Sequence, residues 1–226
     1  MDRVNWDRWA PASGILAVAC WVATFFLPAK KPPDAGDPGA KFTAFLTDHR
    51  TALLVGAYIG LLGVVFFIWF LGSLVTTMRD RGEPRVAAIA FGAGLLGGGL
   101  ALFAFTMQTA LAWGLGTEVD GAIVKTLVLG PNFAIMFPIA ALSAAAAIAA
   151  LRSGIFPQWY GAAGLIATAW FLVGGAALAR DGFFSPQGGF MFVGLIGFFA
   201  WLLLTSILLL RQMPEEAPTT AAIPAS

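Results

Sequence analysis

Long apolar segments alternate with short polar segments along the whole chain. Charged side chains leave six runs without Asp, Glu, Lys or Arg, which are residues 9–29, 51–78, 86–117, 126–151, 153–179 and 182–210. About 20 apolar residues are enough for one helix to cross a bilayer, and no run is long enough for two helices and a turn. The pattern therefore predicts six transmembrane helices near residues 11–29, 51–77, 86–113, 131–151, 159–179 and 188–210.

The runs are continuously apolar, whereas the strands of a transmembrane barrel alternate between apolar and polar residues over about 10 positions. The sequence thus predicts an all-α integral membrane protein with a single domain over residues 1–211. The proline-rich tail 212–226 is expected to be disordered. Arg3 and Arg8 precede the first run, as in a signal peptide. However, cleavable cores span only about 7–15 residues. The apolar stretch from 15 to 29 extends back through residues 10–12, and Trp21 and two phenylalanines stand where small residues should precede cleavage, so we expect it to be retained.

Two of the connecting segments carry amphipathic patterns. Asp37-Pro38 is a typical helix start, and Phe42, Phe45 and Leu46 follow it at helical spacing. Residues 114–130 repeat the pattern, and Gly130-Pro131 is expected to break the chain before the fourth span. We interpret both segments as short helices at the outer interface of the membrane. The first of them is either a packing lid or a substrate gate.

Composition supports the membrane interpretation and limits the kinds of partner that we expect. The chain of 226 residues is 59% hydrophobic and 11% charged, whereas a soluble domain carries about 25% charged residues. The net charge of +1 gives no reason to expect nucleic acid as a partner. Cys20 is the only cysteine, which excludes an internal disulfide and a multi-cysteine centre. The expected partners are the lipid bilayer and another membrane protein.

Positive charge gives a weak indication of orientation. Three arginines crowd the short segment 79–85, and short loops rich in Lys and Arg stay in the cytoplasm. The six cations on the opposite side are spread over longer connections. The sequence therefore predicts a multi-pass protein of the cell membrane with both its N-terminus and its C-terminus in the cytoplasm.

Polar residues within the predicted spans are few. No ionisable residue lies at the centre of a span, which argues against proton coupling and against transport of charged substrates. Gln108, Thr106, Thr109 and Asn132 are the candidates for a polar pocket, next to a helix kink expected at Pro138. The alternative is that Gln108 and Asn132 bridge helices or meet headgroup water.

A second group of candidates lies on the predicted outer face. Asp48, His49, Glu118 and Asp120 share that side of the membrane, and carboxylates with a histidine can hold a divalent cation or act in acid–base catalysis. The chain has no HExxH, no second histidine and no GxSxG motif. A solvated charge cluster is therefore the favoured interpretation. We predict no catalytic residue, no metal and no cofactor.

Two stretches carry a family resemblance. One is residues 45–50 leading into 53–58 and 67–72, and the other is residues 151–161 with its Arg-x-Gly-x-x-Pro-x-Trp-x-Gly turn. They resemble six-helix integral membrane proteins of actinobacteria that belong to a domain-of-unknown-function family. The resemblance implies six helices with an inner N-terminus and implies no activity. In the turn itself, Gly154 can end a helix and Arg152 can meet inner-leaflet phosphates.

The function is less constrained than the fold. Small residues four apart, such as Gly56 with Gly60 and Gly94 with Gly98, allow close packing of membrane helices. Together with the charge-free spans, they favour a non-enzymatic scaffold, accessory subunit or partner in a membrane complex. The first alternative is a carrier or channel for a small neutral or lipidic solute. The second is a membrane enzyme with a site on the outer face.

Overall fold

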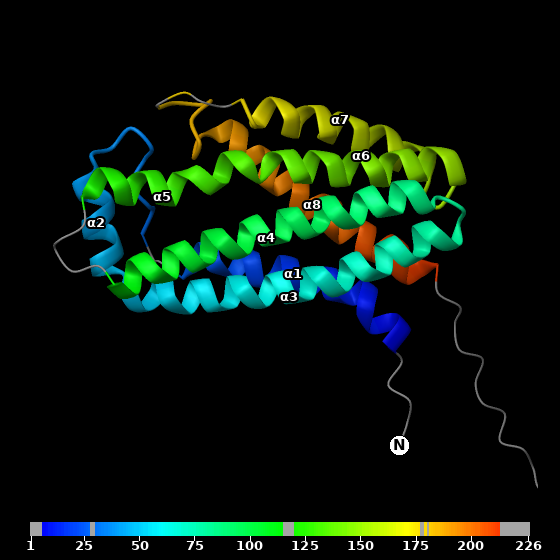
Figure 1. Ribbon diagram of the computed structural model, residues 1–226, viewed down its shortest axis with the longest axis horizontal. Helices are drawn as coiled ribbons and strands as arrows, with labels where there is room; N and C mark the ends of the chain where they lie inside the picture. Colours follow the sequence, from blue (N-terminus) through cyan, green and yellow to red (C-terminus); the bar gives the residue numbers. More distant parts are fainter. Residues whose placement is uncertain (1–5, 28–29, 115–119, 177–178, 180, 213–226) are drawn as a thin grey trace, which may run out of the picture.

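The computed structural model describes residues 6–27, 30–114, 120–176, 179 and 181–212, except for the side chains of residues 6–8 and 132. All regular structure in these residues is α-helical, as the sequence predicts. The helices are α1 (Trp6–Phe26), α2 (Gly39–Asp48), α3 (Arg50–Asp80), α4 (Pro84–Gly114), α5 (Gly121–Ala134), α6 (Met136–Ser153), α7 (Gln158–Gly174) and α8 (Gly189–Arg211). All but α2 run along the long axis of the molecule, and α2 lies across one end (Figure 1).

Five helical stretches in the described part are long and apolar enough to cross a membrane. They are Trp9–Phe26, Arg50–Asp80, Pro84–Gly114, Gly121–Ser153 and Gly189–Arg211. Helix α7 has 17 residues, so it is about 26 Å long at 1.5 Å per residue, slightly less than a hydrocarbon core of about 30 Å. The end of the predicted fifth span, at residues 177–178, lies outside the described residues, and so does the tail after residue 212.

The long helices close into a ring. Helix α1 contacts α3, and contacts then follow between α3 and α4, α4 and α6, α6 and α7, α7 and α8, and finally α8 and α1. Successive long helices run in opposite directions, so that α1 begins and α8 ends at the same end of the bundle (Figure 1). We call this end the arginine end, because Arg79, Arg81, Arg85, Arg152 and Arg211 lie there. The opposite end, with α2, is the α2 end.

Glycines leave notches, which are gaps without a side chain on the surface of a helix, and close packing at these notches holds the ring of helices together. A Cβ atom on Gly63 of α3 would lie 2.6 Å from the indole nitrogen of Trp21 on α1, and one on Gly94 of α4 would lie 2.5 Å from Leu71 on α3. Large side chains from neighbouring helices thus occupy the space that a glycine leaves. Since apolar burial gives no drive for association within lipid, such close packing supplies the attraction between helices.

Helices α5 and α6 form one nearly continuous stretch, which corrects the expected chain break at Gly130-Pro131. The helix continues through Pro131 to Ala134 and is interrupted only at Ile135. Pro138 lacks the N–H group that would bond to the carbonyl of Ala134, so the interruption falls where the hydrogen-bond ladder loses a donor. Helix α5 extends the line of α6 rather than lying apart from it (Figure 1).

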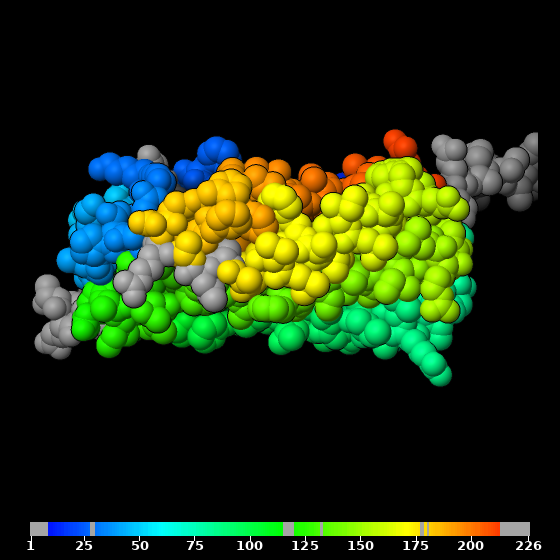
Figure 2. Space-filling model, turned by 90° about the horizontal axis from the view of Figure 1, so that it is seen from above, coloured from blue at the N-terminus to red at the C-terminus, as the bar shows by residue number. Residues whose placement is uncertain are grey.

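A second, smaller apolar core lies at the α2 end. Its buried residues are Ala35, Phe42, Leu46, Leu53, Leu111, Ala112, Val124 and Leu129. The helix expected after Asp37-Pro38 forms, and it packs mainly on α5. The two backbones touch where both helices begin, since a Cβ on Gly121 would lie 2.6 Å from the carbonyl carbon of Gly39. Figure 2 shows α2, in blue, gathered at one end of the elongated molecule.

Candidate functional site

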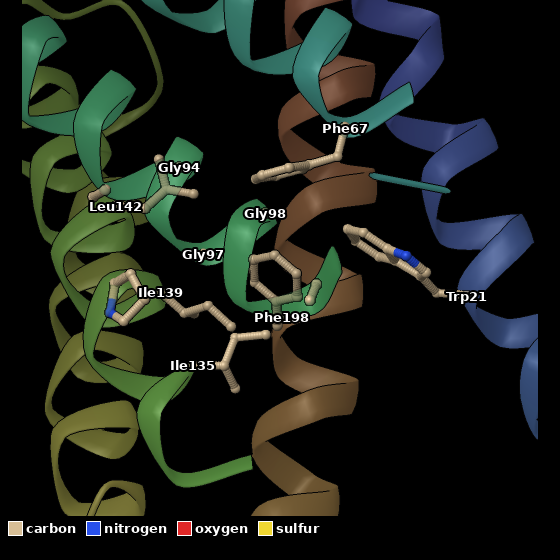
Figure 3. Close-up of a pocket in the computed structure, with 12 residues that line it drawn as sticks. Trp21, Phe67, Gly94, Gly97, Gly98, Ile135, Ile139, Leu142 and Phe198 are labelled. Atoms are coloured by element: carbon tan, nitrogen blue, oxygen red, sulfur yellow. The ribbon is translucent and has the colours of Figure 1, made fainter. Parts of the chain in front are cut away.

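A cavity of about 30 Å³ lies at the centre of the ring. Five helices contribute to its wall, which consists of Trp21, Phe67, Ala93, Gly94, Gly97, Gly98, Ala101, Ile135, Pro138, Ile139, Leu142 and Phe198. Trp21, Phe67 and Phe198 approach it as a group of aromatic rings, and Ile135 and Ile139 face them from the helix interruption (Figure 3). The cavity exists because Gly97 and Gly98 provide no side chain opposite the helix interruption at Ile135.

The cavity wall is almost wholly apolar. The indole N–H of Trp21 is already used, because it donates to the carbonyl oxygen of Gly60 at 3.1 Å. The rings of Trp21, Phe67 and Phe198 lie 5.7 to 6.3 Å apart between centroids. The space could hold one or two molecules of the size of water, but a cavity with such a wall stays dry. It suits a small apolar molecule.

Gln108, Thr106 and Thr109, three of the candidates for a polar pocket, are not among the residues that line this cavity. Thr106 is exposed on α4, whereas Gln108 is half-buried, because two residues along a helix correspond to a rotation of about 200°. Thr109 is also half-buried and donates to the carbonyl of Phe105 at 2.8 Å. The backbone of Asn132 lies in α5, which contacts α4, but its side chain lies outside the description.

Two of the candidates on the predicted outer face, His49 and Asp120, contact backbone groups. The Nδ1 atom of His49 lies 3.1 Å from the carbonyl oxygen of Phe45, and the two rings stack at 4.6 Å. Asp120 caps α5 by accepting a hydrogen bond from the N–H of Ala122 at 2.8 Å. Asp48 is exposed at the end of α2. Glu118 lies outside the described residues, within which no three His, Cys, Asp or Glu side chains form a group that could hold a metal.

Sequence reasoning missed a charged contact at the arginine end. The Nε of Arg152, on the last turn of α6, lies 3.3 Å from a carboxylate oxygen of Glu83, just before α4. The Glu83 side chain is only 10% exposed, whereas that of Arg152 is 66% exposed. Gly154 ends α6 in the left-handed conformation, with a φ of 64°, as expected. No local signal pairs Glu83 with Arg152, because the two residues are far apart in the chain.

Polar contacts at the α2 end were also missed. Lys125 of α5 donates to the backbone carbonyl of Asp37 at 2.9 Å, and Arg50 donates to the carbonyl of Trp113 at the end of α4 at 3.3 Å. The Lys41 ammonium donates to the carboxylate of Asp37 at 2.6 Å. This hydrogen bond, helped by the backbone N–H of Asp34, lowers the pKa of Asp37.

One stripe of α4 faces away from the bundle. Its exposed residues are Ala88, Gly92, Leu96, Gly99, Phe103 and Thr106, and we call it the α4 lipid face. A Cβ placed on Gly92 or on Gly99 would meet no atom within 4 Å, unlike one on Gly94 of the same helix. The two glycines are seven residues apart and therefore share one side of the helix. They are notches that no side chain of the described residues fills.

The comparisons with known proteins add no relative to this picture. No protein-family model, curated protein or solved structure matches the chain.

Proposed function

We propose that the chain crosses the cell membrane six times, with α7 as the fifth span and both termini in the cytoplasm. The antiparallel order of the helices supports this topology, since α1 begins and α8 ends at the same end of the bundle (Figure 1). The excess of arginine at that end supports a cytoplasmic position for it.

We propose further that the protein is a non-enzymatic subunit that assembles with another transmembrane helix through the α4 lipid face. The open notches at Gly92 and Gly99 carry this proposal. Elsewhere in the ring, notches such as Gly63 and Gly94 are filled by a neighbouring helix. An unfilled pair on one exposed side has the form of a contact surface for a further helix, because small residues let two backbones approach closely.

Thr106 extends the same stripe with a hydroxyl group. Hydrogen bonds of serine and threonine between membrane helices are worth about 0.6 to 2 kcal/mol. Thr106 makes no hydrogen bond within the part of the chain that the structure describes, so its hydroxyl is free for a partner. Gly92, Gly99 and Thr106 recur every seven residues, which is the spacing of a left-handed helix pair.

Site-specific photocrosslinking in native membranes tests the assembly. Leu96 lies between the two notches and is 59% exposed, and Ile166 on α7 is 71% exposed as a matched control position. A photoreactive residue at 96 should form a discrete protein adduct, and the same residue at 166 should react with lipid. The double variant Gly92→Leu/Gly99→Leu should abolish the adduct, whereas Gly197→Leu, at an open notch on α8, should not. Lipid adducts alone at position 96 would refute the proposal.

A carrier for a small neutral solute is the second candidate, and the central cavity favours it. The cavity lies beside the interruption at Ile135, and carriers place their binding sites where membrane helices are discontinuous. Its wall would select a small apolar solute. A carrier must open this space to solvent, so Ile139→Cys in a Cys20→Ser background should react with a small neutral thiol reagent. Thr47→Cys, exposed at the α2 end, is the positive control. Complete protection of position 139 would exclude the carrier.

A further inference from the structure

The two ends of the bundle differ in how their charges are compensated. At the α2 end, the described side chains include five cations, Lys30, Lys31, Lys41, Arg50 and Lys125, and five carboxylates, Asp34, Asp37, Asp48, Asp120 and Asp181. Two ion pairs form within this group, from Lys31 to Asp34 and from Lys41 to Asp37, each at 2.6 Å. The described side chains of the α2 end are therefore balanced in charge and partly paired.

The arginine end is different, because it has five described arginines and only two carboxylates, Asp80 and Glu83. The carboxylate of Glu83 already forms an ion pair with Arg152. Arg79, Arg81 and Arg85 are all exposed, and none of them forms an ion pair within the described chain. Among the described residues, the turn between α3 and α4 therefore carries three exposed arginines and one exposed carboxylate, that of Asp80.

The fold places these three arginines on one tight turn. Arg79 lies in the last turn of α3, Arg81 caps that helix, and Arg85 lies in the first turn of α4. Gly82 reverses the chain between them with a φ of 83°, a conformation that glycine adopts without strain. The reversal brings three arginines from seven consecutive residues to one tip of the bundle, which lies at the opposite end from α2 (Figures 1 and 2).

The surface next to this tip is apolar. Ile89, one turn along α4 from Arg85, is 57% exposed, and Trp159 at the start of α7, elsewhere at the same end of the bundle, is 55% exposed. Exposed tryptophan at helix ends is typical of the membrane interface. An exposed apolar side chain on α4 therefore lies one helical turn from Arg85, where an acyl chain can pack beside a bound headgroup.

We propose that Arg79, Arg81 and Arg85 form a binding site for the phosphate group of an anionic phospholipid. Arginine binds phosphate oxygens in pairs through its planar guanidinium group, and basic residues beside the membrane attract anionic headgroups. The neighbouring apolar surface selects a lipid over a soluble phosphate. This inference does not depend on the α4 lipid face or on any partner protein.

Native mass spectrometry of the full chain tests the site. The protein would be released from micelles that contain equal amounts of phosphatidylglycerol and phosphatidylcholine. The wild type should retain phosphatidylglycerol in preference to phosphatidylcholine. Each Arg→Gln change should weaken this retention by about fivefold, and Arg79→Gln/Arg81→Gln/Arg85→Gln should abolish the preference. The matched control Lys30→Gln/Lys31→Gln/Lys41→Gln removes three cations from the α2 end and should keep it.

Two further measurements distinguish paired arginine geometry from charge alone, and a lipid from free phosphate. The triple lysine variant Arg79→Lys/Arg81→Lys/Arg85→Lys keeps the charge, should fold as the wild type does, and should bind with an intermediate affinity because lysine lacks the paired geometry. Inorganic phosphate at millimolar concentration should not displace the lipid. Equal retention of both lipids by the wild type, an unchanged preference in the glutamine variant, or displacement by inorganic phosphate would overturn the proposal.

Discussion

At the scale of single residues, glycine allows two kinds of close contact between helices. At positions such as Gly63 and Gly94 it makes room for a side chain of the adjacent helix, and at Gly39 and Gly121 it lets two backbones touch. A flexible side chain can adjust to an added methyl group, but a backbone cannot, so the crossing of α2 and α5 should be the least tolerant of substitution.

Substitution of Gly121 by alanine tests this difference. The new Cβ would clash with the backbone of α2, and overpacking of this kind costs about 1–3 kcal/mol. Gly72→Ala is the control, because its Cβ would meet open space and alanine favours a helix over glycine by about 1 kcal/mol. Thermal unfolding in detergent should give a lower midpoint for Gly121→Ala and an equal or higher one for Gly72→Ala. Equal unfolding midpoints for the two variants would refute the close backbone contact between α2 and α5.

The carboxyl of Asp37 predicts how the α2 end responds to pH. Its pKa is lowered mainly by the hydrogen bond from Lys41, so the ionised form stabilises the folded state. The stabilisation is present above the ordinary pKa of about 3.9 and is lost as the pH falls through the lowered pKa. The difference in unfolding midpoint between wild type and Asp37→Asn should therefore be largest near neutral pH and shrink in acid. A pH-independent difference for Asp37→Asn would contradict the argument.

At the scale of helices, the connections determine how far each one extends. Gly154 with a positive φ ends α6, whereas Pro131 fails to end α5. The sequence predicted the first correctly, because a left-handed terminal residue favours glycine. It predicted the second wrongly, because one proline removes a single hydrogen bond, and continued packing of an apolar helix can offset that loss. Apolar runs therefore locate the helices well, while proline alone locates their ends poorly.

The contact between Glu83 and Arg152 joins the α3–α4 turn to the end of α6. Arg152→Gln leaves the largely buried carboxylate of Glu83 without its charged partner, which should cost about 1–3 kcal/mol. Glu83→Gln leaves an arginine that is already well exposed and should cost less. Unfolding of both single variants and the double variant would measure the coupling. A larger loss of unfolding free energy for Glu83→Gln than for Arg152→Gln would contradict the burial of the Glu83 carboxylate.

At the scale of the whole molecule, the ring of helices separates a dry interior from two differently charged ends. The sequence predicted the all-helical class and the absence of charge from the span centres, because lipid imposes both on composition. It could not predict the order of helices around the ring, the cavity opposite Gly97, or the pairing of Glu83 with Arg152. These features depend on residues that are distant in the chain, and local patterns carry no information about such contacts.

The topology of α7 decides between a chain with five crossings and one with six. Helix α7 is the shortest of the ring, yet its direction along the bundle requires a sixth crossing if both termini share one side (Figure 1). Single cysteines at exposed positions in a Cys20→Ser background distinguish the two cases. Asp181→Cys reports the connection after α7, Lys31→Cys the α2 end, and Arg81→Cys the arginine end.

Labelling of intact cells with a membrane-impermeant maleimide is the most direct measurement of the six-crossing topology. The account predicts that Asp181→Cys and Lys31→Cys react in intact cells and that Arg81→Cys reacts only after the membrane is permeabilised. Labelling of Asp181→Cys only after permeabilisation, together with Arg81→Cys, would show that α7 does not cross and would contradict the account.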